Sequence, residues 1–334
     1  MLSNSLVQQN FFENLKKKIP NELSIIDELA ELLRMSRDSV YRRVRGDSAL
    51  TFAEILTISE AYDISLDALV GVSKKNKVSF QYQPINENRF NFDLYFQTLL
   101  NFFEYFNAHE DVELIYAANE AKFQLLHVPE IAAFKLFFWT KTSYDFKEQH
   151  RALFNFEKFN QKYGDIIKKI VWNYVKIPTV EIINEDYLNS TFNQIRFYYD
   201  SGYFNSRDEA LLICDKIKEL LEHNRREAEL GFKFMFGSDE EGSSNNLTLY
   251  HNDVILSDNV VAARLKEEYF CFLVINNINY LVTGNEKFSK DTFNYLSNLQ
   301  KKSTLISVSA ERERNIFYNK LGGKLTNLKA YISR

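Results

Sequence analysis

Residues 26–46 read IDELAELLRMSRDSVYRRVRG and contain two short helical patterns separated by a turn. Their apolar residues recur at the spacing of amphipathic helices. These residues are Ile26, Leu29, Ala30 and Leu33 in the first helix and Val40 and Val44 in the second. Ser24 and Ser36 are the expected N-caps, and Gly46 is the expected stop of the second helix. Two helices joined by a turn of about three residues predict a helix-turn-helix motif.

The segments on either side of this motif predict further short helices. Before it, the apolar residues at 11–19 are spaced for a first helix. After it, Thr51 and Glu54 form a capping box that opens another helix, and residues 65–69 read as a short closing helix. We therefore expect an N-terminal all-α bundle of five helices in residues 1–71.

The motif lies in a strongly basic part of a weakly acidic chain. The 334 residues include 41 Lys and Arg against 45 Asp and Glu, a net charge of −4, which argues against binding a partner through bulk charge. Arg34 to Gly46 nevertheless hold five arginines and a single acid, Asp38. A basic run of this kind is also typical of a solvated helix face.

The basic run can be a local binding surface or a solvated helix face. The positions of its side chains around the second helix separate these two interpretations. At about 100° per residue, most of the polar side chains fall on one arc and Val40 and Val44 fall on the opposite side. The residues of the arc are Arg37, Asp38, Tyr41, Arg42 and Arg45. Arg43 falls on the far flank, so we expect it to pair with an acid of a neighbouring helix.

The stretch 26–46, together with ISLDAL at 64–69, resembles the helix-turn-helix domain of the lambda-repressor-like, or Xre, family. Ala30 matches the small residue of the first helix, and the buried positions of the family correspond to Leu29, Leu33, Met35 and Val40. Arg34 stands where the family often has Gly, and a left-handed backbone there would cost about 1 kcal/mol. The whole chain also resembles Bacteroidetes-type regulators with YRR-x-RG in the recognition helix and a long C-terminal region of undetermined role.

This resemblance implies that residues 36–46 are a recognition helix for the DNA major groove. Arginine can bond guanine O6 and N7 together, which makes Arg37 and Arg42 the expected base readers. The candidate base contacts are Arg37, Arg42, Tyr41 and Asp38. The candidate phosphate contacts are Ser36, Arg45 and Tyr41. Asp38 can accept from cytosine N4, but an acid in the first turn also stabilises a helix without any DNA.

The rest of the chain predicts a second, larger region. Residues 72–80 read as a polar, basic linker, and residues 81–334 alternate helical and strand patterns. Short runs between 247 and 282 predict an antiparallel meander. We therefore expect a C-terminal α+β region, mostly helical with a small antiparallel sheet, for dimerisation and sensing. The acidic Gly/Ser/Asn segment at 237–246 is a candidate boundary within it.

The sequence of this region contains no motif typical of a catalytic, metal-binding or phosphate-binding site. The five histidines (109, 127, 150, 223 and 251) follow no metal-binding spacing, and Gly322-Gly323-Lys324 lacks the rest of a phosphate loop. Two cysteines, Cys214 and Cys271, cannot form a disulfide framework. We expect no enzyme activity, no catalytic or metal-ligating residues and no cofactor.

The expected location is the cytoplasm. No stretch reaches the ~18 to 20 consecutive apolar residues of a membrane helix, and the first residues lack the pattern of a signal peptide. No membrane partner is expected.

Two functions fit these patterns. The first is a sequence-specific transcriptional regulator that binds double-stranded DNA as a homodimer and answers to a small-molecule or protein effector. The aromatic residues at 134–139 could line an effector pocket or form ordinary core. The apolar stripe of the helix at 206–230 fits a dimer contact or a core equally well. The second function is a protein-interaction scaffold that uses the N-terminal helices for protein contacts.

Overall fold

The computed structural model describes residues 8–9, 11–13, 15–16, 19, 22–62, 64, 77–82, 92–143, 151–254, 259–275 and 279–334. The chain divides into two compact units, Met1–Ser79 and Phe80–Arg334. Each unit has its own hydrophobic core and is described separately.

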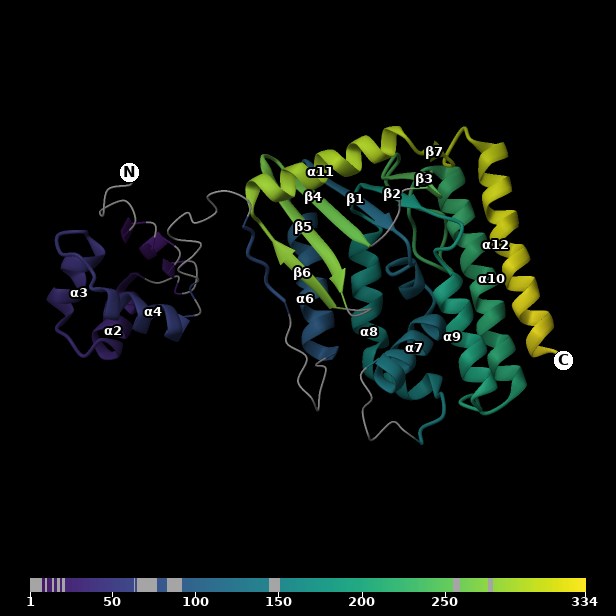
Figure 1. Cartoon of the computed structure of the whole chain (residues 1–334), viewed down its shortest axis with the longest axis horizontal. Coiled ribbons are helices and arrows are strands. Elements are labelled where there is room, and N and C mark those ends of the chain that lie inside the picture. Colours follow the sequence, from purple (N-terminus) through teal and green to yellow (C-terminus); the bar gives the residue numbers. More distant parts are fainter. Residues whose placement is uncertain are drawn as a thin grey trace. The chain divides into compact units, whose positions relative to one another are not determined.

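The helices delimited in the first unit are α2 (Glu22–Leu32), α3 (Arg37–Val44) and α4 (Phe52–Tyr62) (Figure 1). Their apolar faces enclose one core, which also takes in the apolar residues expected of a first helix. The buried members are Phe11, Phe12, Leu15, Ile19, Ile25, Leu29, Val40 and Ile58. The predicted closing helix at 65–69 lies outside the described residues.

Local signals fix the ends of these helices. Ser36 is the N-cap of α3 and accepts a hydrogen bond from Ser39 N at 3.3 Å, and Gly46, with a φ of 83°, follows its end. Arg34 has a φ of 51°, so the turn of the motif has the left-handed residue expected there. The predicted cap at Ser24 is wrong, because α2 already begins at Glu22.

The second unit is built around a seven-stranded sheet of order β6-β5-β4-β1-β2-β3-β7. The strands are β1 (Val112–Ala118), β2 (Thr179–Ile183), β3 (Leu247–His251), β4 (Val260–Leu265), β5 (Glu268–Ile275), β6 (Asn279–Thr283) and β7 (Thr304–Leu305). β1, β2 and β3 are parallel, whereas β4, β5, β6 and β7 join antiparallel at the two sides. The sheet is therefore mixed, with a parallel centre.

Helices cover both faces of the sheet. Most pack on one face, where they form the main core with Leu114, Tyr116 and Leu249. These helices are α6 (Phe92–Asn107), α7 (Pro129–Phe138), α8 (Phe156–Tyr174), α9 (Asn189–Asp200), α10 (Arg207–Leu230) and α12 (Glu311–Ile332), together with the short turns η1 (Gln124–Leu126) and η2 (Trp139–Ser143). α11 (Glu286–Lys301) covers the other face, where Phe293 and Leu296 meet Ile115 and other strand residues (Figure 1).

The predicted fold class is wrong: the chain has a seven-stranded mixed sheet rather than a small antiparallel one, and three helices rather than five are delimited among the described residues of the first unit. We expected a small antiparallel meander, but β3 pairs in parallel with β2, and only β4, β5 and β6 form the meander. The helices between β1, β2 and β3 provide the long crossovers that parallel pairing needs. A strand pattern shows that a segment is extended and which side is buried, but its partner is chosen by these long-range connections. Val78, Phe80 and Tyr82 alternate like a strand in the sequence, but this segment forms one bridge, between Gln81 and Val282.

Two further segments singled out in the sequence lie in helices of the second unit. The stripe on α10 is core, since Ile213, Ile217 and Leu220 are buried within the same chain. Gly322 and Gly323 lie inside α12 and form no phosphate loop. Among the described residues, no helix is long and apolar enough to span a membrane.

Candidate functional site

The arginine arc of α3 lies on the surface of the first unit. All six predicted contact residues are exposed: Ser36, Arg37, Asp38, Tyr41, Arg42 and Arg45. On the opposite side of the helix, Val40 is buried and Val44 is half-buried in the core. Packing therefore holds α3 by its apolar stripe and leaves one polar, basic face to the solvent.

The two expected base readers have different surroundings. Arg37 Nε lies 2.9 Å from Asp27 Oδ1, but both side chains are more than half exposed, so this ion pair is worth about 0–1 kcal/mol and exchanges readily. The Arg42 side chain makes no hydrogen bond or ion pair with another described residue. Its backbone carbonyl accepts from Asp47 N and Ser48 N, which anchors the end of α3. Within the described part of the chain, Arg42 thus presents a guanidinium without a partner on an anchored backbone.

The expected phosphate contacts lie beside these arginines. The Arg45 guanidinium is 5.5 Å from the centre of the Tyr41 ring, within range of a cation–π contact. The Ser36 hydroxyl is engaged with Ser39 N and Ser39 Oγ. The start of α3 therefore offers a phosphate mainly its first backbone N–H groups, which have no partner inside the helix.

Arg43 points away from this surface, as its helical angle predicts. Its Nη2 lies 2.8 Å from Glu54 Oε1 and its Nε lies 3.2 Å from Glu54 Oε2. Glu54 also accepts from Thr51 N at 2.7 Å, so the predicted capping box is present. Burial alone would raise the pKa of Glu54, but the hydrogen bonds from Arg43 and Thr51 outweigh it and hold that pKa below its ordinary value.

Gln8 fixes the end of α3 from another direction. Its Nε2 donates to the carbonyls of Arg43 and Ser48 at 2.7 and 2.8 Å, and its Oε1 accepts from Leu50 N at 2.9 Å. A single side chain thus ties the first helical segment to the residues that follow the recognition helix. No sequence motif predicts this contact.

In the second unit, an apolar pocket of about 420 Å³ lies between α6 and the β4–β5–β6 part of the sheet. Aromatic side chains make up much of its wall, including Tyr95, Phe102, Phe270, Phe272 and Tyr280. Of the aromatic cluster that we singled out in the sequence, only Trp139 lines this pocket. Phe134 and Phe137 are fully buried core residues. The pocket residues come from segments far apart in the chain, which is why no local pattern predicts it.

The carboxyl ends of the three parallel strands carry one asparagine each, namely Asn119, Asn184 and Asn252. Ligands often bind at this edge of a parallel sheet. Here the side chains serve the fold: Asn184 Nδ2 donates to Asn119 Oδ1 at 2.6 Å, and Asn252 Nδ2 donates to Ser303 Oγ at 3.0 Å.

A buried polar cluster lies between α10 and the helical face of the sheet. The pKa of Lys233 is lowered to about 8 by burial, although Glu181 and Glu227 act to raise it. Burial raises the pKa of Glu181 against the opposing effect of Lys233. Burial also lowers the pKa of His127 to about 4. These groups form a polar interior site that the sequence analysis missed.

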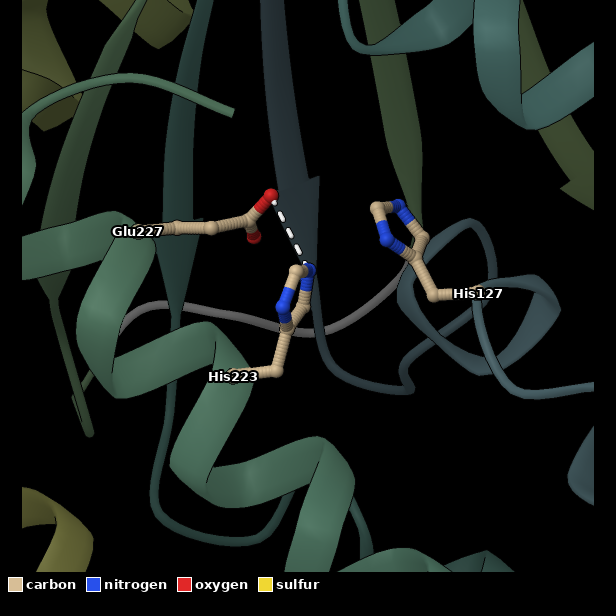
Figure 2. A group of neighbouring side chains, drawn as sticks. All are labelled: His127, His223 and Glu227. Atoms are coloured by element: carbon tan, nitrogen blue, oxygen red, sulfur yellow. Dashed lines mark ion pairs between the residues drawn. The ribbon is translucent and has the colours of Figure 1, made fainter. Parts of the chain in front are cut away.

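Within the described part of the chain, the residues able to hold a metal ion together are His127, His223 and Glu227 (Figure 2). His223 and Glu227 are four residues apart on α10, a spacing that places both side chains on one face of a helix. This was the one signal available in the sequence. His127 follows η1 and reaches the pair only through the tertiary fold.

Comparisons with known proteins provide no assignment for this chain: no family model matches it, and the searches of curated proteins and of solved structures give no match.

Proposed function

We propose that the protein is a sequence-specific DNA-binding transcriptional regulator of the cytoplasm, with α3 as its recognition helix. The observation that carries this proposal is the division of arginines on α3. Arg37, Arg42 and Arg45 are exposed on one face, whereas Arg43 is bound to Glu54. Arginines that served only the fold would not have to lie exposed together on one face of the helix.

The proposed assembly on DNA is a homodimer. An eight-residue helix offers few contacts, which is too little for tight specific binding by one copy. Two copies related by a two-fold axis would read a palindrome whose half-sites are about one helical turn apart, roughly 34–36 Å. The surface that joins the copies is not the apolar stripe of α10, because that stripe is core.

Selection of bound sequences from a random pool of double-stranded DNA tests this proposal. The full-length protein should enrich a palindrome, and its affinity should fall steeply as salt rises, because phosphate contacts release counterions. An unenriched pool, with binding that stays weak at low salt, would overturn the proposal. Capture of a protein partner that is lost with Arg42→Ala would then favour a scaffold that uses the same helices.

The apolar pocket supports a sensing role for the second unit. Pockets of about 300–1,000 Å³ with apolar walls are typical of small-molecule sites, and this one falls within that range. We expect an apolar effector, and it must bind one arrangement of the dimer better than another in order to alter DNA affinity.

A thermal-shift screen of metabolites and cell extract, paired with DNA-affinity measurements, tests the sensing role. Val274→Trp should fill the pocket and abolish a hit, whereas Val254→Trp, at a site that is 89 % exposed, should leave it unchanged. A compound that raises the melting temperature without changing DNA affinity would show binding without regulation.

A further inference from the structure

The strongest unassigned feature of the molecule is the group formed by His127, His223 and Glu227 in the core of the second unit. Their candidate ligand atoms all lie within 4.8 Å of one another, and all three residues are buried. Figure 2 shows that the two imidazole rings and the carboxylate converge from α10 and from the segment after η1.

Two of these groups have nitrogen atoms without a hydrogen bond. Within the part of the chain that the structure describes, His127 Nδ1 and His223 Nε2 are buried and have no hydrogen-bond partner. His223 Nε2 is 3.3 Å from Glu227 Oε1, close enough for an ion pair but not arranged as a hydrogen bond. Leaving a buried polar atom unsatisfied costs about 1–3 kcal/mol, so the two nitrogens favour a ligand between the rings.

The carboxylate is already oriented for such a ligand. Phe234 N donates to Glu227 Oε1 at 3.0 Å, which fixes the side chain on the face that also carries His223. Hydrogen bonds of this kind from the surrounding protein commonly set the direction of a metal-binding carboxylate.

The charges around the group also favour a cation. Glu227 and Glu181 face the same small cavity, and Lys233 is the basic side chain among the described residues that line it. Lys233 is itself engaged by Ile177 O at 2.7 Å and Thr179 Oγ1 at 2.5 Å. Two buried carboxyl groups are therefore set against one ammonium group. A divalent ion would place a positive charge beside the Glu227 carboxylate, since buried charges are normally paired or coordinate metals.

The surroundings leave space for a fourth ligand and a route for the ion. The cavity of about 20 Å³ beside His127 and Glu227 holds about one water molecule. On its other side, His127 lines a groove of about 470 Å³ between α7, α8 and α10. Three protein ligands plus water is the coordination of a zinc site with an open position.

We propose that His127, His223 and Glu227 form a binding site for a transition-metal dication, Zn²⁺ by ligand type, with its fourth position open to a water in the adjoining polar cavity. Two imidazoles and a carboxylate suit Zn²⁺ better than they suit Mg²⁺ or Ca²⁺, which take oxygen ligands. Tetrahedral bonds of about 2.0–2.1 Å bring ligand atoms to roughly 3.3 Å apart, so binding draws the three side chains closer together. The site is independent of DNA recognition by α3.

Zinc titration of the full-length protein, after removal of metals with a chelator, tests the site by calorimetry. The expected result is one Zn²⁺ per chain, with affinity lowered at least tenfold by each of His127→Gln, His223→Gln and Glu227→Gln. His109→Gln is the matched control, because His109 lies near the surface with its Nδ1 2.8 Å from the carbonyl of Tyr105. The control should bind Zn²⁺ as the unaltered protein does.

A chain that binds no Zn²⁺ at micromolar concentration, or one whose three variants bind it normally, would overturn the site. In that case His223 and Glu227 are simply an ion pair within the core. Circular dichroism identifies a variant that fails to fold. For that situation, X-ray absorption of the zinc-loaded unaltered protein counts the ligands directly. Two imidazoles with oxygen ligands support the site, and one imidazole or none contradicts it.

Discussion

At the scale of single residues, Arg42 and Arg43 are neighbours in sequence with opposite roles. We expect Arg42→Ala to weaken binding to the selected DNA site by about 1–3 kcal/mol and to relax preference at one base pair. Arg43→Ala should keep the base preference, because it removes the pair with Glu54 rather than a DNA contact. Fluorescence anisotropy on the selected site and on single-base variants measures both effects. Loss of base preference in the Arg43 variant alone would contradict the assignment of the two faces.

Arg34 stores backbone strain at the turn of the motif. With a φ of 51°, it occupies a region that costs a residue with a side chain about 1–2 kcal/mol. We expect Arg34→Gly to stabilise the first unit by about 0.5–1 kcal/mol, after the entropy that glycine gains in the unfolded chain. Hydrogen exchange of the buried amides in α3 and α4 measures this in the full chain. Arg42→Gly, within α3, should instead destabilise the first unit.

At the scale of elements, α10 ends at Gly231, a position that requires glycine. Gly231 has a φ of 74°, and a Cβ there would lie 2.7 Å from Val308 Cγ2. We expect Gly231→Ala to destabilise the second unit by about 2–3 kcal/mol, from backbone strain plus overpacking. Gly202→Ala, with a φ of 68° and open space around it, should lose only the backbone part, about 1 kcal/mol. Urea unfolding compares the two.

Removing the Val308 methyl groups beside residue 231 separates the backbone strain of Gly231→Ala from its steric overlap. Combining Gly231→Ala with Val308→Ala should bring the loss close to that of Gly202→Ala, because the steric contact is then gone. A double variant as unstable as Gly231→Ala would show that the contact with Val308 has no energetic weight.

The segment after β1 carries a pH-dependent contact. Burial alone would raise the pKa of Glu120, but Lys135 and Lys122, at 3.2 and 2.7 Å, outweigh it and lower that pKa from 4.5 to about 2. An acid whose pKa is lowered by folding stabilises the fold at any pH above its pKa in the unfolded chain. This stabilisation is lost as the pH falls towards the lowered pKa. We therefore expect up to about 3 kcal/mol of stability to disappear between about pH 4.5 and pH 2.

Calorimetric melting over this pH range, with Glu120→Gln beside the unaltered protein, measures the Glu120 contribution. The variant should have a lower melting temperature at neutral pH and a flatter decline in acid, since it cannot lose a charge that it does not have. Equal slopes for the two proteins would place the acid sensitivity elsewhere.

At the scale of the whole molecule, the proposal requires two copies of the chain. We expect the full-length protein to sediment as a dimer at micromolar concentration, and Arg42→Ala to leave this unchanged, because α3 serves DNA and not assembly. A monomer that also fails to dimerise on a palindrome would contradict the two-fold arrangement. Leu212→Lys, on the exposed side of α10, should not alter assembly if the buried stripe of that helix is purely core.

The local parts of the fold were predictable from sequence, and the sheet was not. Ser36, Thr51 and Ser206 mark helix starts that the structure contains, because a cap acts on N–H groups within one turn. Runs that correspond to β3, β4, β5 and β6 were also found, since alternation is local, whereas the central strand β2 and the short strand β7 were not predicted. The parallel pairing of β1, β2 and β3 depends on crossovers that span long stretches of chain, and strand patterns alone favoured an antiparallel meander.

The same division holds for the candidate sites. The polar arc of α3 and the inward position of Arg43 followed from local spacing, because helical geometry converts spacing into direction without reference to other segments. Only the tertiary structure brought His127 to His223 and Glu227, and only it formed the pocket between α6 and the sheet. Both depend on contacts between residues far apart in the chain, and such contacts are chosen by the packing of the whole core rather than by any local pattern.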